Sequence, residues 1–227
     1  MVYDAITVMK SLVRSFRDQL KRTPFYAQWK ELGWYPDYFY WVLRGKPQRS
    51  PHVIKQKTVL EYAQRFQVKT LIETGTYYGE MVSAMRDRFD KIYSVEFVPE
   101  LAERAKKRFA MDPHIQILQG DSKTVLPEIL RNINSSTLFW LDAGYYGWAE
   151  LATDKSRLTA ELEAILRHPV AGHVILMDDA RGLDGLNGSL SIQDVKDYIL
   201  REFPGRSVAV EYDIIRITPS TLPSTNL

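Results

Sequence analysis

From residue 51 onward, short apolar segments alternate with longer segments of helical character, and this alternation restricts the fold more than any other feature. Strands rich in Val, Ile, Leu and aromatic residues are expected at 70–74, 92–96, 114–118, 137–142, 173–177, 207–211 and 214–218. Helices are expected at 52–66, 79–88, 99–109, 122–132, 153–167 and 191–203. Strands separated by helices form right-handed crossover units, so most of the sheet is predicted to be parallel.

The last two strands are separated only by Tyr212 and Asp213. Such a link is too short for a crossover, so this pair is predicted to be antiparallel. The sequence therefore predicts the α/β class, with a doubly wound, mostly parallel seven-stranded sheet, an antiparallel last strand and an N-terminal helical extension. Ligands of such sheets bind beyond the carboxyl ends of the strands, so candidate site residues are sought there.

The N-terminal extension, residues 1–50, differs in composition from the rest. It opens with an amphipathic helical pattern and continues into an aromatic cluster between Phe25 and Trp41. Aromatic residues of this kind pack against a neighbouring domain, or they form a substrate lid or a homodimer surface; the sequence leaves these interpretations open. Residues 51–218 are predicted to form the main domain, and residues 219–227 a flexible tail.

Composition excludes several classes of protein. The chain has 227 residues and no cysteine, which rules out disulfides, thiolate metal sites and a cysteine nucleophile. The net charge of +2 gives no reason to expect nucleic acid or an anionic membrane as a partner. We find no apolar run long enough for a membrane span and no signal-peptide pattern, so a cytoplasmic protein is expected.

The loop after the first expected strand carries the first candidate site. Glu73 ends this strand, and Gly75 and Gly79 flank a tight turn that opens a helix. Glycine permits positive φ and a close approach of the backbone to a ligand. The loop is neither a G-x-G-x-x-G dinucleotide motif nor a phosphate-binding P-loop, and a carboxylate such as Glu73 suits a cationic ligand group.

Acidic residues also end the next two strands. Glu96 ends the second strand, where an acid can accept hydrogen bonds from both hydroxyls of a ribose, or can simply be a solvated charge. Gly120, Asp121 and Ser122 follow the third strand. Asp121 can bond an adenine amino group and Ser122 can cap the next helix, and the cap alone would also explain this motif.

This series of strand-end motifs resembles the class I S-adenosylmethionine-dependent methyltransferases, over residues 51 to about 218. The resemblance implies that Glu73 and Gly75 lie beside the methionine part of the cofactor, that Glu96 binds the ribose and that Asp121 binds the adenine. The other cofactor-binding residues that it implies, for the loops around these acids, are Thr74, Thr76, Gly79, Gly120 and Ser122.

The fourth and fifth strands end in three further acids, Asp142, Asp178 and Asp179. Converging carboxylates repel one another, and a hard divalent cation with oxygen ligands removes that conflict; a solvated rim is the alternative. The pattern is similar to that of the magnesium-dependent O-methyltransferases of the catechol and sugar types. This likeness implies that the three acids bind Mg2+ and that Asp142 is catalytic.

The implied reaction is direct transfer of a methyl group to a hydroxyl of a small molecule, with the metal holding and acidifying that hydroxyl. The chain departs from the family at Gly144, where relatives have an acid or His, so the general base is open among Tyr145, Tyr146 and His52. A non-catalytic protein that binds S-adenosylmethionine is the alternative, followed by a nicotinamide-dependent oxidoreductase. Methylation of nucleic acid is disfavoured by the near-neutral charge.

Overall fold

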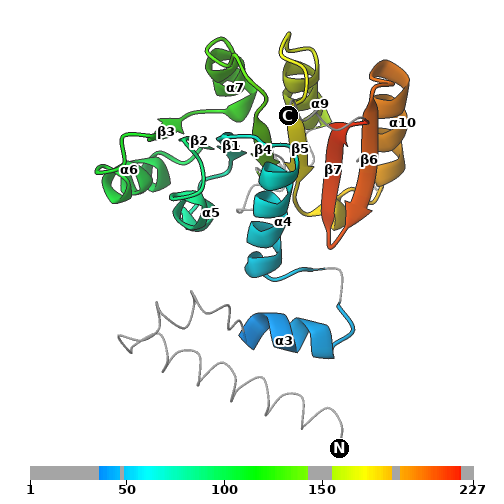
Figure 1. Ribbon diagram of the computed structural model, residues 1–227, viewed down its shortest axis with the longest axis horizontal. Coiled ribbons are helices and arrows are strands. Elements are labelled where there is room, and N and C mark those ends of the chain that lie inside the picture. The colour runs from blue at the N-terminus through cyan, green and yellow to red at the C-terminus, as the bar shows by residue number, and fades with distance from the viewer. Residues whose placement is uncertain (1–35, 47–48, 143–154, 186–189, 221–227) are drawn as a thin grey trace, which may run out of the picture. The chain divides into compact units, whose positions relative to one another are not determined.

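The computed structural model describes residues 36–46, 49–142, 155–185 and 190–220 (Figure 1). The chain divides into two compact units, Met1–Ile54 and Lys55–Leu227. In the first unit, helix α3 (Pro36–Leu43) carries Trp41, which is buried and lies against Tyr38 with ring centroids 6.3 Å apart. The aromatic residues of the predicted cluster between 25 and 35 lie outside the described residues, so the role of the cluster stays a prediction.

The second unit contains one seven-stranded sheet with the order β3-β2-β1-β4-β5-β7-β6. Its strands are β1 (Thr70–Thr74), β2 (Lys91–Glu96), β3 (Ile115–Gln119), β4 (Leu138–Leu141), β5 (Val174–Met177), β6 (Arg206–Glu211) and β7 (Ile214–Pro219). The first five strands pair in parallel, and β7 is antiparallel to both β5 and β6. The predicted doubly wound sheet with an antiparallel last strand is confirmed.

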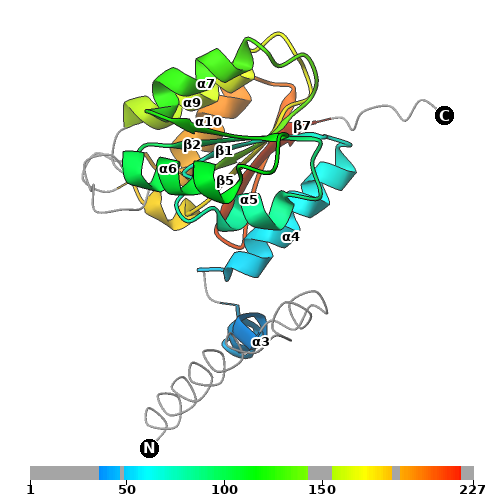
Figure 2. The same cartoon turned by 90° about the vertical axis from the view of Figure 1, so that its left-hand side faces the viewer.

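Helices cover both faces of this sheet (Figure 2). One face packs against α4 (His52–Arg65), α5 (Glu80–Met85) and α6 (Pro99–Arg108), and the other against α7 (Ser122–Leu130), α9 (Lys155–Leu166) and α10 (Ile192–Glu202). Alternate strand residues supply the two cores, since Leu71 belongs to the first and Ile72 to the second. Of the helices in the described part of the chain, none has the length and apolar character to cross a bilayer.

Helix α5 (Glu80–Met85) is shorter than the predicted segment 79–88, because it ends at Met85. The chain must return to the start of β2 at Lys91, and the N–H of Asp90 already donates to the carbonyl of Lys69 at 2.9 Å. A turn at 86–88 therefore replaces the last helical residues, and Phe89, which follows it, packs into the core. This pairing across the sheet overrides the local helical pattern.

The register of the strands places their carboxyl ends at one edge. Thr74 of β1 is level with Val95 of β2 and with Leu141 of β4, and Leu141 is level with Met177 of β5. The parallel pairing of β1 and β4 extends one residue further, because the N–H of Asp142 donates to the Thr74 carbonyl at 3.0 Å. The residues that follow the aligned positions are Gly75, Glu96, Asp142 and Asp178.

Candidate active site

The loop from β1 to α5 is held against the end of β2. The N–H groups of Gly75 and Thr76 both donate to the carbonyl of Val95, at 2.8 and 3.3 Å. Gly79 has φ of 71° and precedes the first residue of α5. A Cβ at Gly79 would lie 2.8 Å from Cε2 of Phe109, so this position requires glycine both for its backbone angle and for its close packing.

Glu73 is buried beneath this loop. The hydroxyl of Ser94 donates to Oε2 of Glu73 at 2.5 Å, and the Ser94 and Thr76 hydroxyl oxygens are 2.6 Å apart. Burial raises the pKa of the Glu73 carboxyl to about 8; the Ser94 hydrogen bond opposes this rise, and the charges of Asp142 and Glu96 add to it. Glu73 is therefore ready to ionise when a cation binds beside it, because an opposite charge lowers a carboxyl pKa.

Glu96 joins the two loops that follow β1 and β2. Its Oε2 accepts a hydrogen bond from the N–H of Tyr77 at 2.7 Å, and its Oε1 accepts one from the N–H of Val98 at 2.9 Å. Tyr77 has φ of 50°, so this loop holds a residue other than glycine in the left-handed region. Each carboxylate oxygen has two lone pairs, so Glu96 keeps capacity for further donors such as ribose hydroxyls.

The residues after β3 form a helix cap. Asp121 is the N-cap of α7, and its Oδ1 accepts a hydrogen bond from the N–H of Lys123 at 3.0 Å. The expectation that Ser122 caps this helix is wrong, because Ser122 is its first residue and the side chain of Asp121 occupies the capping position. The buried Ser122 hydroxyl finds no hydrogen-bond partner in the described part of the chain, and neither does the buried hydroxyl of Thr74. Two polar groups at this edge can thus bond a ligand.

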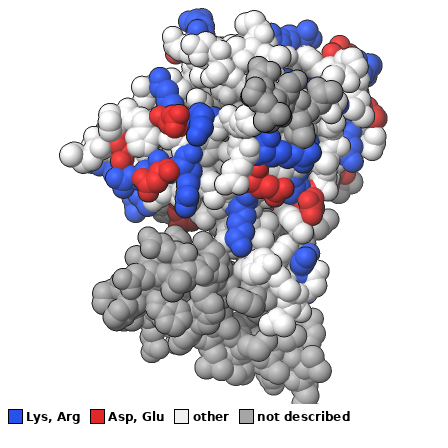
Figure 3. Space-filling view, in the orientation of Figure 1, with Lys and Arg blue, Asp and Glu red and all other residues white. Residues whose placement is uncertain are grey.

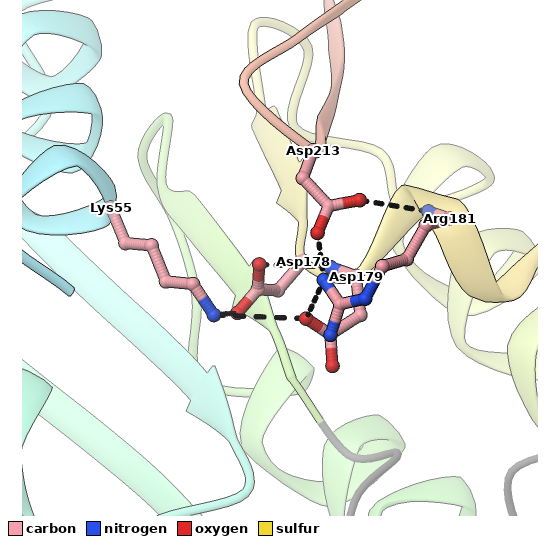
Figure 4. Close-up of polar contacts among 5 residues, drawn as sticks. All are labelled: Lys55, Asp178, Asp179, Arg181 and Asp213. Atoms are coloured by element: carbon pink, nitrogen blue, oxygen red, sulfur yellow. Dashed lines mark hydrogen bonds and ion pairs between the residues drawn. The ribbon is translucent and has the colours of Figure 1, made fainter. Parts of the chain in front are cut away.

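The two acids after β5 lie beside two basic side chains (Figure 4). Lys55 of α4 donates a hydrogen bond to Oδ2 of Asp178, and its Nζ lies 3.7 Å from Oδ1 of Asp179. Arg181 lies 2.9 Å from the same Asp179 oxygen and also binds Asp213, in the turn between β6 and β7. The cluster of acids is therefore neutralised in part by the protein itself.

Burial also raises the pKa of the Asp142 carboxyl, to about 8. The charge of Asp178 adds to this rise, and the charge of Lys55 opposes it. Burial likewise raises the pKa of Asp178, against the effect of its ion pair with Lys55. Asp142, Asp178 and Lys55 thus form one electrostatic group at the ends of β4 and β5.

The carboxylates of Asp178 and Asp179 already face two cationic side chains, which would repel a magnesium ion. Both oxygens of Asp178 are engaged, Oδ2 by Lys55 and Oδ1 by the N–H of Asp179 at 2.8 Å. Oδ1 of Asp179 is shared by Lys55 and Arg181. Within the described ranges, no three acidic or histidine side chains are grouped as a metal ion would require. Magnesium binding by Asp142, Asp178 and Asp179 stays a prediction.

The general base stays open as well. Gly144, Tyr145 and Tyr146 lie outside the described residues. His52 begins α4 and belongs to the other compact unit. His173 lies at the start of β5, at the opposite edge of the sheet from the acids. No base is therefore assigned.

Four residues at this edge were not singled out from the sequence: Lys55, Arg181, Asp213 and Phe97. Lys55 lies on the same helix face as the buried residues Val59, Tyr62 and Phe66, which form the apolar stripe of α4. A lysine in line with such a stripe was the sequence signal that could have identified it. Phe97 directly follows Glu96 and is 42% exposed, which is unusual for a large apolar side chain next to a candidate site. Arg181 and Asp213 are brought together by the order of the strands, and no sequence pattern around either residue indicates that they pair.

Comparisons by sequence give no relative: no protein-family model matches the chain, and no curated protein matches it. Solved structures do match. An O-methyltransferase from Bacillus cereus in complex with S-adenosylhomocysteine is 16% identical over 79% of this chain and 86% of its own, with a TM-score of 0.57. TomG from Streptomyces achromogenes, an O-methyltransferase of tomaymycin synthesis solved with S-adenosylmethionine, is 17% identical over 82% of this chain and 87% of its own, with a TM-score of 0.55.

PaMTH1 from Podospora anserina, a methyltransferase bound to S-adenosylhomocysteine, is 18% identical over 78% of this chain and 82% of its own, with a TM-score of 0.52. Identities this low establish the fold alone. The chain has the Rossmann-like fold of the S-adenosylmethionine-dependent methyltransferases, as the sequence resemblance implied.

Proposed function

We propose that the protein is an S-adenosylmethionine-dependent methyltransferase that transfers a methyl group to a hydroxyl of a small molecule. The observation that carries the proposal is the position of Glu96, whose carboxylate joins the loops after β1 and β2 at the carboxyl edge of the sheet. An acid fixed in this way, in a sheet of this order, suits the ribose of an adenosine cofactor.

The neighbouring residues support the same cofactor. Glu73 offers a buried carboxyl to the cationic methionine end, and the glycine loop lets the backbone approach it closely. Asp121 and the Ser122 hydroxyl offer polar atoms for the adenine. Phe97 offers an exposed ring after β2, and its backbone carbonyl accepts a hydrogen bond from the side chain of Gln119 of β3 at 3.1 Å. Apolar rings with a few polar groups are typical of adenine sites.

In the proposed methyl transfer, the main role of the protein is to orient the cofactor and the acceptor. S-adenosylmethionine supplies an electrophilic methyl group on a sulfonium centre. Glu73 faces the cationic end and Asp142 orients the acceptor hydroxyl from the end of β4, one strand away in the sheet. The bond from the methyl group to sulfur breaks as its bond to the acceptor oxygen forms, which leaves S-adenosylhomocysteine, and the hydroxyl proton is released to water. Holding two reactants in line removes much of the entropic cost of the reaction.

A small-molecule acceptor fits the surface better than nucleic acid does. In the view of Figure 3, lysine and arginine are interspersed with acidic residues and form no basic stripe of the kind that follows a phosphate backbone. Homodimerisation and a cytoplasmic location stay expectations from the sequence. Magnesium assistance is left out of the proposed mechanism, because Lys55 and Arg181 already pair with the acids that would bind the metal.

The test combines binding and turnover. S-adenosylmethionine and S-adenosylhomocysteine should raise the melting temperature and NAD should not, because a ligand that binds only the native state stabilises it. Release of S-adenosylhomocysteine is then measured with a panel of phenols, catechols and sugars. Binding without release for any acceptor would favour the non-catalytic alternative, and a shift with NAD alone would favour an oxidoreductase.

A further inference from the structure

The acidic cluster contains a basic side chain at the point where the sequence pattern predicts a metal ion. Lys55 lies on the apolar stripe of α4, and its side chain is only 16% exposed. Its ammonium group binds Oδ2 of Asp178 and lies 3.7 Å from Oδ1 of Asp179, so one cation faces two carboxylates that come from the end of β5 (Figure 4).

We infer that Lys55 is the resident cation of this cluster and takes the place of a divalent metal ion. Both oxygens of Asp178 and Oδ1 of Asp179 face the Lys55 ammonium, the Arg181 guanidinium or a backbone N–H, so the charge that would attract a metal ion is already compensated. A divalent ion would have to displace Lys55 from Asp178 and then lie close to a displaced positive charge in a half-buried site, where like charges are weakly screened.

If the protein is the proposed methyltransferase, Lys55 also lies where it can contact the methyl acceptor. A lysine ammonium carries three donors. One is used on Asp178 and a second faces Asp179, so the third can bind the oxygen of an acceptor hydroxyl beside Asp142. Lys55 would then be a catalytic residue that orients the acceptor oxygen, and transfer would proceed in the presence of a chelator.

Calorimetric titration of MgCl2 and MnCl2 into the full-length protein tests the inference. Lys55→Met keeps the length of the side chain and removes its charge, whereas Lys55→Arg keeps the charge. Lys57, which is exposed on the same helix, gives the matched control Lys57→Met. We expect metal binding at millimolar concentration in Lys55→Met, at least about tenfold tighter than in the wild type, Lys55→Arg or Lys57→Met.

Wild-type protein that binds the metal as tightly as Lys55→Met would overturn the inference, and so would a folded Lys55→Met that binds no metal. If Lys55→Met fails to fold, tight binding of metal by the wild type still overturns it. A parallel titration with S-adenosylhomocysteine separates the two proposals. If the wild type does not bind that ligand, the proposed function fails, while the metal titrations still decide the role of Lys55.

Discussion

Ser94 of β2 donates a hydrogen bond to Glu73 of β1 at 2.5 Å, across two adjacent parallel strands whose register sets these residues side by side. The pair lies at the carboxyl edge of the sheet, and the Glu73 side chain is buried. Burial raises the pKa of Glu73 to about 8, so at neutral pH this carboxyl is mostly protonated until a cation arrives. This property gives the first prediction.

Binding of S-adenosylmethionine should tighten with rising pH. Below pH 8 the cationic ligand must first displace a proton from Glu73, and the required ionisation becomes easier as the pH approaches the pKa. Between pH 6 and pH 7.5 the affinity measured by calorimetry should rise by about tenfold. The heat should vary with the ionisation enthalpy of the buffer, which reports the released proton.

Glu73→Gln is the control for this pH dependence. The amide oxygen can still accept the hydrogen bond from Ser94, but the group cannot ionise. The variant should bind S-adenosylmethionine more weakly at pH 7.5 and with the same affinity at pH 6. A pH dependence equal to that of the wild type would show that Glu73 does not face the cofactor.

The raised pKa of Glu73 also predicts how the stability of the protein varies with pH. This pKa is higher in the folded protein than in the unfolded chain. The contribution of Glu73 to the free energy of unfolding is therefore fully present below about pH 4.5 and is lost as the pH rises toward 8. Without ligand, Glu73→Gln should therefore gain stability relative to the wild type between pH 5 and pH 9. Melting temperatures across this range check the prediction, and two parallel curves would contradict it.

His173 should destabilise the protein in acid. Its Nδ1 accepts from the N–H of Thr137 at 3.2 Å, and its Nε2 lies 3.0 Å from Nδ1 of His168. Burial, with smaller effects from His168 and Arg206, lowers the pKa of His173 to about 4. The unfolded chain takes up this proton near pH 6.5 and the folded protein does not, so stability falls between pH 6.5 and pH 4 by up to about 3 kcal/mol.

Urea unfolding at pH 7.5 and pH 4.5 measures this loss, with His173→Gln as the comparison. The variant lacks the titrating ring, so the difference between its two free energies of unfolding should be smaller than that of the wild type by about 2 kcal/mol. Equal differences in the two proteins would assign the acid sensitivity to other groups.

Much of the fold could be predicted from the sequence because its signals are local. Apolar runs such as 70–74 and 174–177 are too short for helices, and the link at Tyr212 and Asp213 forces an antiparallel pair. The end of α5 could not be predicted, because it is set by pairing between the Lys69 carbonyl and Asp90 rather than by helical propensity. The positions of Glu73, Glu96 and Asp121 at one edge followed from the parallel order of their strands.

The partners of the acids were harder to predict. Lys55 precedes Asp178 by 123 residues, and only the packing of α4 on the sheet brings the two together. Arg181 and Asp213 meet because β7 lies beside β5. A pattern of acids at strand ends indicates negative charge that needs a cation, but it does not distinguish a metal ion from a lysine contributed by a distant helix.

Gly79→Ala should destabilise the protein. The new Cβ would lie 2.8 Å from the ring of Phe109, and φ of 71° is strained for alanine. We expect a loss of about 1–3 kcal/mol in the free energy of unfolding, together with weaker binding of S-adenosylhomocysteine. Gly205→Ala is the control, because a Cβ there meets nothing within 4 Å. Equal stability of the two variants would contradict the tight packing of the loop.

The central claim is that the carboxyl edge around Glu96 binds an adenosine cofactor, and calorimetric titration with S-adenosylhomocysteine tests it most directly. The wild type and Glu100→Ala, which changes an exposed acid of α6, should bind with equal affinity. Glu96→Ala, checked for native fold by circular dichroism, should bind about 1–3 kcal/mol more weakly, and NAD should bind to none of them. Unchanged affinity in Glu96→Ala, or no binding to the wild type, would contradict the account.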